Sequence, residues 1–267
     1  MMEEKFDLNR VQVSGIVQRI WDYGEDIFVR LEFYPDEDRP PRYITLKIAG
    51  GMIDGEFVTL QPGELVQVEG HLADAPYTES IREFFNDAKA QPFYEDTELA
   101  AEWNGIEIKR VGTQIVVMTL AAVTANPNLN NVMIQGIVTR SWVGGADLFA
   151  RLAVYDENTE IIKASNNGKL PKRKPHYITI RILKGELDGK KIAMQKRNRV
   201  RISGHLHIHF YRQFLPAILE RANKKKLVET LPPKGGEIYA LRDSLYVVGN
   251  SIVVLASRSN RRKAEKV

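Results

Sequence analysis

The chain contains two copies of one sequence unit, and this repeat limits the possible fold more than any other feature. Asn9–Tyr34 aligns without gaps on Asn130–Tyr155, with 13 of 26 positions identical and a constant offset of 121. Tyr43–Leu72 aligns on Tyr177–Leu206 at an offset of 134, with 12 of 30 positions identical. Collinear matches of this length predict two domains of the same fold in tandem.

A third, shorter match completes each copy. It places Gly112 on Gly249 and Ile115–Val117 on Ile252–Val254. Between the copies, the segment 125–128 (Ala-Asn-Pro-Asn) is rich in turn-forming residues and is typical of a linker. We therefore expect a first domain over residues 1–125, a linker over 126–129, a second domain over 130–258 and a basic C-terminal tail over 259–267.

Each copy is expected to be mainly β. In the second copy, apolar residues alternate or run together in five segments separated by turn residues: Val132–Val138, Leu148–Tyr155, Tyr177–Leu183, Arg199–Tyr211 and Ser251–Ser257. Helical patterning precedes the last strand of each copy, over about 93–103 and 215–228. Five strands with a long connection between the fourth and fifth predict two tandem Greek-key barrels of the oligonucleotide-binding type (OB fold).

Composition excludes several classes of protein and separates the two copies by charge. The chain has no cysteine, which excludes disulfides and thiolate metal sites, and no apolar run approaches the roughly 18 residues of a membrane span. Residues 1–128 carry 11 Lys and Arg against 23 Asp and Glu, whereas residues 129–267 carry 27 against 11. This asymmetry favours a polyanion as the partner of the second copy, although attraction between an acidic and a basic face also explains it.

Strand motifs in both copies resemble those of the bacterial single-stranded DNA-binding proteins. The resemblance rests on five segments: Asn130–Val138, Phe149–Val154, Tyr177–Ile182, Arg199–Leu206 and Val66–Leu72. It implies a cytoplasmic, nucleoid-associated protein without enzymatic activity or cofactor, acting in replication, recombination or repair. It also implies a homodimer that presents four OB folds. The chain departs from the family at 257–263, which is basic where the family has an acidic tail that recruits partner proteins.

Strand parity separates a core face from an outward face in the second copy. Side chains alternate across a strand, so the apolar series Leu148, Ala150 and Leu152 places their neighbours on the opposite face. The outward residues of the second and third strands are then Phe149, Arg151, Ala153, Tyr155, Tyr177, Thr179 and Arg181. Aromatic rings interleaved with arginines are the chemistry that unstacked bases and phosphates require. The alternative is that these rings cover a packing element or a dimer interface.

The fourth strand and a long loop add further candidates in the second copy. Parity places Arg199, Arg201 and His205 on one side of the fourth strand, and the loop before the third strand contributes Lys172, Arg173 and Lys174. The loop is equally consistent with a solvated charge run. Tyr211, and Tyr77 in the first copy, stand where the resemblance places a base-stacking aromatic. Trp142 follows the first strand and is expected near the groove, where it either stacks on a base or plugs the barrel.

The first copy retains weaker equivalents of this pattern. They are Phe28, Arg30, Tyr34, Tyr43, Lys47 and Tyr77. Its fourth strand carries Gln67 and Glu69 where the second copy has Arg201 and Ser203. We therefore expect the second copy to supply most of the affinity for nucleic acid, and the first to pair subunits or to hold a partner.

No catalytic or metal site is expected. The chain has no Walker loop, Gly-x-Ser-x-Gly elbow or His-Glu-x-x-His motif. His205, His207 and His209 alternate along one strand as zinc ligands can, but the surrounding arginines disfavour a cation. The sequence therefore predicts binding of single-stranded DNA without strong sequence preference, with no membrane and no small-molecule substrate. RNA binding and a protein-interaction role for the OB folds are the alternatives.

Overall fold

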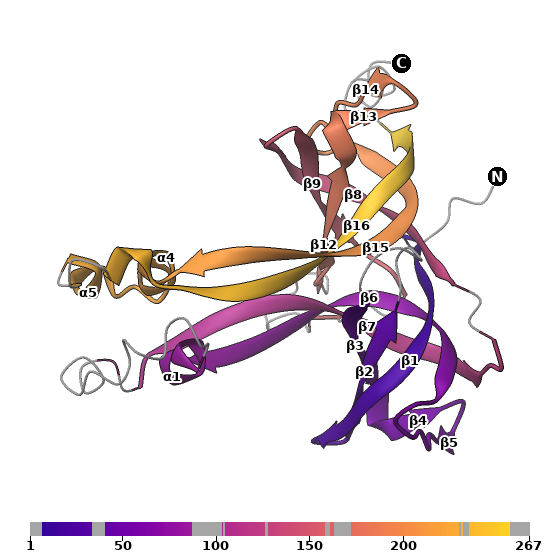
Figure 1. Ribbon diagram of the computed structural model, residues 1–267. Coiled ribbons are helices and arrows are strands. Elements are labelled where there is room, and N and C mark those ends of the chain that lie inside the picture. Colours follow the sequence, from indigo (N-terminus) through magenta and orange to yellow (C-terminus); the bar gives the residue numbers. More distant parts are fainter. Residues whose placement is uncertain are drawn as a thin grey trace. The chain divides into compact units, whose positions relative to one another are not determined.

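A computed structural model describes residues 7–33, 41–86, 103, 105–125, 128–157, 161–162, 172–229, 231 and 235–256 of the chain. The first copy contains β1 (Asn9–Tyr23), β2 (Asp26–Phe33), β3 (Arg42–Ile48), η1 (Ala49–Gly51), β4 (Met52–Ile53), β5 (Glu56–Phe57), β6 (Leu65–Ser80), α1 (Ile81–Phe85) and β7 (Glu107–Ala122) (Figure 1). The described part of the chain is thus mainly β, as predicted.

The second copy repeats this order with additions. It contains β8 (Asn130–Gly144), β9 (Asp147–Val154), β10 (Ile161–Ile162), β11 (Lys172–Arg173), β12 (His176–Ile182), η2 (Leu183–Gly185), β13 (Glu186–Leu187), β14 (Lys190–Lys191), β15 (Arg199–Phe214), α4 (Leu215–Arg221), α5 (Lys225–Glu229), η3 (Gly235–Glu237) and β16 (Tyr239–Ala256). None of the helices in the described ranges is long and apolar enough to cross a membrane.

Each copy closes into a five-stranded barrel. In the first, β1 pairs with β2, β2 with β3, β3 runs parallel to β7, β7 lies beside β6, and β6 returns to β1. In the second, β8, β9, β12, β16 and β15 close in the same order. Alternating apolar residues such as Val29 and Leu31, or Ala150 and Leu152, are fully buried inside the barrels. The prediction of two tandem OB folds is confirmed.

The pairing of the last strand corrects the third sequence match. Leu46 pairs with Ile115 in the first barrel, and its equivalent Ile180 pairs with Val247 in the second. The last strands therefore correspond at an offset of 132, and the match of Gly112 to Gly249 is wrong. Short apolar runs in both strands allowed an alignment five residues out of register, because identity alone does not report which residue faces the core.

Two glycines at equivalent positions mark where the fourth strand crosses the last strand. A Cβ on Gly70 would stand 2.2 Å from the carbonyl oxygen of Val116, and one on Gly204 would stand 2.0 Å from that of Val248. Real Cβ atoms do not approach an oxygen so closely, so both positions require glycine. The pair Val116 and Val248 again fixes the offset of 132.

The first copy contains a helix that the sequence pattern did not predict. α4 and α5 lie within the expected 215–228 region or one residue beyond it, whereas α1 lies at Ile81–Phe85, outside the expected 93–103. Ser80 accepts a hydrogen bond from the backbone N–H of Glu83, and the Glu83 carboxylate accepts one from the backbone N–H of Ser80. This capping box was the sequence signal for α1. Of the expected helix, residues 93–102 lie outside the described residues.

The two barrels are joined by antiparallel pairing of their first strands. β1 pairs with β8 so that Val11 lies opposite Val132 and Asn9 opposite Ile134. The cores of both barrels belong to one continuous cluster of buried apolar side chains. Each copy also ties its first strand to its fourth by the same side chain: Asn9 bonds both backbone polar groups of Leu72, and Asn130 does so with Leu206.

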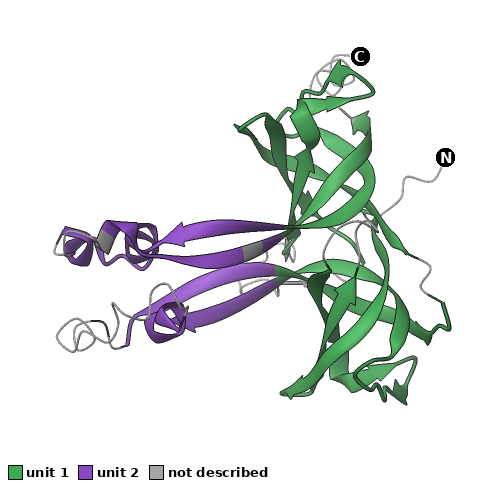
Figure 2. Cartoon of the chain, in the orientation of Figure 1, with its two compact units in different colours: residues 1–74, 113–208, 245–267 green, residues 75–112, 209–244 purple. Residues whose placement is uncertain are grey.

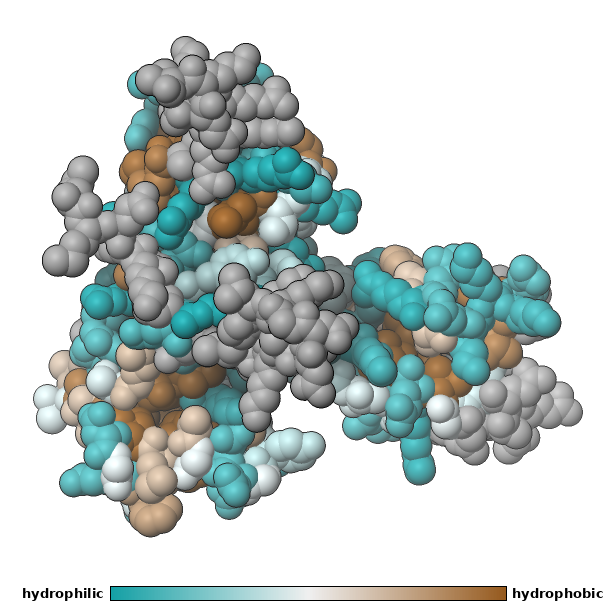
Figure 3. Space-filling view, turned by 180° about the vertical axis from the view of Figure 1, so that it is seen from behind, coloured by the Kyte–Doolittle hydropathy of each residue, from teal (hydrophilic) through white to brown (hydrophobic). Residues whose placement is uncertain are grey.

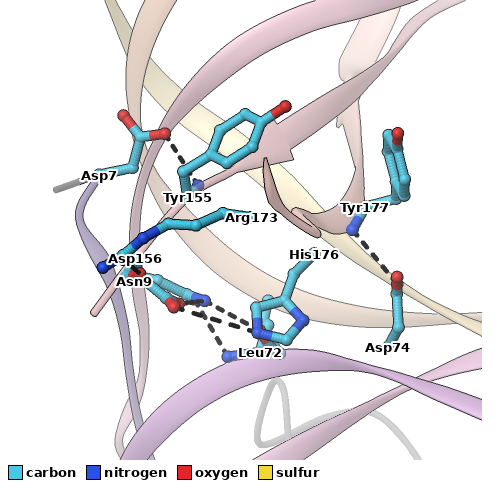
Figure 4. Close-up of polar contacts among 9 residues, drawn as sticks. All are labelled: Asp7, Asn9, Leu72, Asp74, Tyr155, Asp156, Arg173, His176 and Tyr177. Carbon is cyan, nitrogen blue, oxygen red and sulfur yellow. Dashed lines mark hydrogen bonds and ion pairs between the residues drawn. The ribbon is translucent and has the colours of Figure 1, made fainter. Parts of the chain in front are cut away.

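A buried polar cluster lies at this junction (Figure 4). Asn9 donates to the Asp156 carboxylate at 2.5 Å, the His176 Nε2 lies 4.0 Å from the other Asp156 oxygen, and Arg173 donates to the Asp156 carbonyl. The rings of His71 and His176 lie 6.1 Å apart. Burial lowers the pKa of His71, and the neighbouring His176 adds to this effect, whereas Asp156 opposes it. The junction therefore favours a neutral His71.

The chain divides into two compact units (Figure 2). Unit 1 comprises residues 1–74, 113–208 and 245–267 and contains both barrels, whereas unit 2 comprises 75–112 and 209–244. Unit 2 contains the adjoining ends of β6 and β7 with α1, and those of β15 and β16 with α4 and α5. The domain boundaries expected from the repeat stay a prediction, and residues 126–127 and 259–267 lie outside the described residues.

Unit 2 has its own core and a buried ionic triad. Phe84, Phe85 and Trp103 from the first copy pack with Ile218 and Leu219 from the second. Glu79 forms ion pairs with Arg110 and Arg242, and Arg110 donates to the side-chain oxygen of Gln213. The segments from the two copies are therefore held together by both apolar packing and buried charge. Apolar side chains also stand among hydrophilic ones on the side of this unit seen in Figure 3.

We predict that removing His71 flattens the dependence of stability on pH. The unfolded state binds a proton near the ordinary value of 6.5, and the folded state binds it only at lower pH. The contribution of His71 to the free energy of unfolding is therefore complete above pH 6.5. This contribution is lost as the pH falls toward the pKa of His71 in the folded state. Urea denaturation between pH 7 and about 5 should show a smaller loss for His71→Gln than for the wild type. The exposed His209, replaced by Gln, is the control; an equal slope for both variants contradicts the prediction.

We also predict that Glu79→Ala destabilises unit 2 by about 2–4 kcal/mol, because it leaves two partly buried guanidinium groups without their carboxylate. Hydrogen exchange measured by mass spectrometry should show faster exchange in 75–86, 105–112 and 209–229. Glu107→Ala, which removes an exposed carboxylate from β7, should leave the exchange unchanged. Exchange as slow in Glu79→Ala as in Glu107→Ala would show that the apolar core alone holds the unit.

Candidate nucleic-acid interface

The outward face predicted for the second barrel exists. β9 and β12 pair so that Phe149 lies opposite Arg181 and Arg151 opposite Thr179. Their neighbours Ala150, Leu152, Ile178 and Ile180 are fully buried in the core. Strand parity thus predicted the orientation of these side chains correctly. Ala153 was also expected on the outward face, but its side chain is buried, with 3% exposed. We call the outward residues of β8, β9, β12 and β16 the second face; its main members are Trp142, Phe149, Arg151, Tyr177, Arg181 and Tyr246.

The centre of the second face is a cluster of three aromatic rings. Trp142 stacks on Phe149 with centroids 5.5 Å apart and planes 10° apart. Tyr246 meets the same phenyl ring edge-on at 5.7 Å. Trp142 therefore lies at the surface beside Phe149 and does not plug the barrel. Sequence reasoning missed Tyr246, because Val247, Val248 and Gly249 that follow it are all buried and leave no alternation to interpret.

Three arginines lie over these rings and over Tyr177. Arg151 lies 5.1 Å from the Tyr177 centroid, Arg181 lies 5.9 Å from Phe149, and Arg140 lies 5.5 Å from Trp142. Arg140 was not among the predicted residues, although its equivalent Arg19 lies over Trp21 at 5.6 Å. Cations held against flat rings at one surface suit a ligand with both π-faces and negative charge.

One of these cations is already paired. Arg181 forms an ion pair of 2.6 Å with Asp147, which also accepts a hydrogen bond from the backbone N–H of Lys184. Burial raises the pKa of Asp147, but the bonds from Lys184 and Arg181 outweigh it and leave the pKa below its ordinary value. The Asp147 carboxylate therefore stays charged at neutral pH, and Arg181 is partly neutralised.

The predicted phosphate contacts on β15 have partners within the chain. Arg199 donates to the Asp7 carboxylate at 2.7 Å, and the same carboxylate accepts the backbone N–H of Tyr155 at 2.9 Å. Arg201 donates through two nitrogens to the side-chain oxygen of Gln135. The Tyr155 ring is half-buried, and burial raises the pKa of its hydroxyl. Sequence reasoning missed Asp7 because it is 192 residues from Arg199.

The remaining second-copy candidates have different settings. His205 is half-buried on β15, Arg173 is held by the Asp156 carbonyl, and Lys174 is exposed. The backbone of Lys172 belongs to β11, and its side chain lies outside the described residues. Tyr211 belongs to unit 2, whereas the other candidates belong to unit 1.

Tyr77 also lies in unit 2, close to charged side chains of that unit. Its side chain is 51% exposed, yet partial burial raises the pKa of its hydroxyl. The charges acting on it include those of Arg110, Glu79 and Arg242. Tyr77 therefore borders the ionic triad of unit 2.

The first barrel carries a matching surface, called the first face. Trp21 stacks on Phe28 with centroids 5.7 Å and planes 16° apart, and Arg30 lies 5.8 Å from the Tyr43 centroid. Lys47 pairs with Asp26 at 2.6 Å, as Arg181 does with Asp147. The Lys47 side chain holds the pKa of Asp26 below its ordinary value, against the effect of burial. Tyr34 lies outside the described residues.

The third aromatic ring of the two faces comes from different strands. In the first face, Tyr23 on β1 meets Phe28 edge-on at 6.4 Å. Its equivalent in the second copy is Gly144, where a Cβ would stand 2.9 Å from the Phe149 ring. There the edge-on ring is Tyr246, whose equivalent in the first copy is Gln114. Both faces thus keep a stacked pair with an edge-on tyrosine.

Among the described residues, no group of three or more His, Asp or Glu side chains is arranged to hold a metal ion. His205, His207 and His209 are therefore not brought together as a metal site. The chemistry of both faces is instead that of aromatic rings and guanidinium groups.

Comparison with known proteins identifies the fold. No family model and no curated protein matches the chain. Among solved structures, it is similar to the wild-type single-stranded DNA-binding protein from Thermus aquaticus, with a TM-score of 0.50, 13% sequence identity, and coverage of 94% of this chain and 95% of that chain. A deletion mutant of the Thermus aquaticus protein matches with a TM-score of 0.49 and 14% identity, covering 94% of this chain and 96% of that chain. The strand motifs therefore predicted the fold correctly: the chain has the same fold as the Thermus aquaticus protein, with two OB folds in tandem.

Proposed function

We propose that this protein binds single-stranded DNA through the two faces, largely without sequence preference, and protects it during replication, recombination or repair. The observation that carries the proposal is the repeated arrangement of a stacked Trp–Phe pair with an arginine over a neighbouring tyrosine. It occurs at Trp142, Phe149, Arg151 and Tyr177, and again at Trp21, Phe28, Arg30 and Tyr43. The solved structure of the same fold is of a single-stranded DNA-binding protein, which supports the proposal.

The physical basis favours single strands over duplex. In a duplex the faces of the bases are covered by their neighbours, whereas in a single strand they are free to stack on aromatic side chains. Each stacked base contributes about 1–3 kcal/mol, and every base has a π-face, so this term is tolerant of sequence. Tyr177 is 37% exposed and Tyr43 is 41% exposed, which leaves ring surface for a base. No chemical step is needed, so the proposal includes no catalysis, cofactor or small-molecule substrate.

Both faces take part in this proposal, with the second as the stronger. The first face is equally complete in rings, but its half of the chain carries net negative charge, which weakens attraction for phosphates. The basic half adds exposed cations such as Lys174. A homodimer that presents four OB folds, with action at the nucleoid, belongs to the same proposal.

The proposal predicts that Phe149→Ala and Tyr177→Ala each weaken binding of oligo-dT by about 1–3 kcal/mol, with a larger loss in the double variant. The measurement is a titration of intrinsic tryptophan fluorescence, because Trp142 stacks on Phe149 and Trp21 reports on the first face. Phe57→Ala is the matched control, since Phe57 is an aromatic side chain that is 82% exposed on β5 in the first barrel. Thermal unfolding checks that each variant is folded.

The titration is repeated with duplex DNA and oligo-U of the same length. Wild-type binding of oligo-dT that is as weak as binding of duplex contradicts the proposal and favours a protein-interaction role. Equal affinity for oligo-U makes RNA an additional ligand, because stacking and phosphate contacts do not recognise the 2′-hydroxyl. Unchanged affinity in the double variant, with the wild type binding, removes the second face from the interaction.

A further inference from the structure

The tyrosine of the second face rests against a carboxylate supplied by the first barrel. Asp74, on β6, accepts a hydrogen bond from the backbone N–H of Tyr177 at 3.2 Å. Figure 4 shows the Asp74 carboxylate pointing at this nitrogen, with the Tyr177 ring rising from the same position. Asp74 is half-buried, so this carboxylate is part of the surface beside the ring.

Asp74 is surrounded by positive charge. Burial nevertheless raises the pKa of Asp74 above its ordinary value, against the bond from the Tyr177 N–H and the charges of His176, Arg151 and Lys174. Arg151 is also the cation that lies over the Tyr177 ring. Among the described residues, the backbone N–H of Tyr177 donates to Oδ1 of Asp74. The second oxygen, Oδ2, therefore keeps its capacity to accept a further hydrogen bond.

The first face does not repeat this arrangement. Its tyrosine is Tyr43, and the residue of the second copy that corresponds to Asp74 is Ile208, which is 5% exposed and belongs to the apolar core. The strands are aligned here without ambiguity, because Gly70 and Gly204 make the same close approach. A carboxylate that bonds the backbone of the exposed tyrosine is thus found in the second face and not in the first.

We propose that Asp74 Oδ2 accepts a hydrogen bond from the exocyclic amino group of the base stacked on Tyr177, so that the second face favours cytosine over thymine. This inference rests on the proposed function. A carboxylate only accepts hydrogen bonds, and the N4 amino group of cytosine donates them. Thymine presents carbonyl oxygens on both sides of its single N–H, and these repel the carboxylate. The preference is superimposed on stacking, which is insensitive to sequence.

The test is the ratio of the affinities for oligo-dC and oligo-dT of equal length, measured at mildly alkaline pH where cytosine runs stay single-stranded. One charge-assisted contact should give the wild type an affinity for oligo-dC about three- to ten-fold above that for oligo-dT. Asp74→Asn preserves the acceptor for the Tyr177 N–H but replaces Oδ2 by an amide donor, which suits a thymine carbonyl. Its ratio should fall to one or below.

Asp188→Asn is the matched control. Asp188 is exposed in the β13–β14 turn of the same barrel at φ 50°, a conformation that Asn tolerates, and the variant removes the same charge. Its ratio should equal that of the wild type. Circular dichroism and thermal unfolding confirm that both variants are folded.

The outcomes separate the inference from the proposed function. If Asp74→Asn raises both affinities by the same factor, Asp74 acts only as a repulsive charge and the inference is wrong. If neither affinity changes, Asp74 serves only to hold the Tyr177 backbone, and the inference is again wrong while single-strand binding stands. If the wild type binds neither oligonucleotide, the proposed function fails and the inference fails with it.

Discussion

The antiparallel pairing of β1 with β8 is the interaction on which the rest of unit 1 depends. Strand edges are open hydrogen-bonding surfaces, and here the first strands of the two copies use theirs on each other. The pairing makes one ten-stranded sheet from two barrels and merges their apolar cores. It also creates the contacts of Asp7 with Arg199, Asn9 with Asp156, and Asp74 with Tyr177. The second face is therefore completed by residues of the first copy.

These contacts show what a covalent tandem permits. In a symmetric homodimer, each substitution occurs twice and must suit both sites. In one chain, each copy can change alone, and the two halves of this chain differ in the sign of their net charge. Asp74 beside Tyr177, against Ile208 in the corresponding place, is an example at a single position. The edge-on ring is another difference, because Tyr23 on the first strand supplies it in one copy and Tyr246 on the last strand supplies it in the other.

Sequence reasoning predicted the features that depend on local alternation and on the repeat. Parity placed Phe149, Arg151 and Tyr177 on one surface, and the strand motifs predicted the fold. It did not predict Tyr246, because three consecutive buried residues follow it, and it shifted the last strand by five residues because short apolar runs align in several registers. Nor did it predict the partners of Arg199, since contacts between segments 192 residues apart leave no periodic signal.

The structure also changes the expected contributions of base stacking and of phosphate contacts to the affinity of the proposed interaction. Arg199, Arg201 and Arg181 count as three phosphate contacts in the sequence, yet each bonds an acceptor within the chain. A phosphate that engages Arg181 meets a cation whose charge Asp147 already partly neutralises, so the gain is smaller than that of an unpaired arginine. Fewer counterions are then released than the number of basic residues suggests, which makes the salt dependence of binding shallower. The aromatic rings carry no such penalty, because their exposed surfaces are open to a base before it arrives. We therefore expect stacking to contribute more to affinity in the proposed interaction than the number of basic residues suggests.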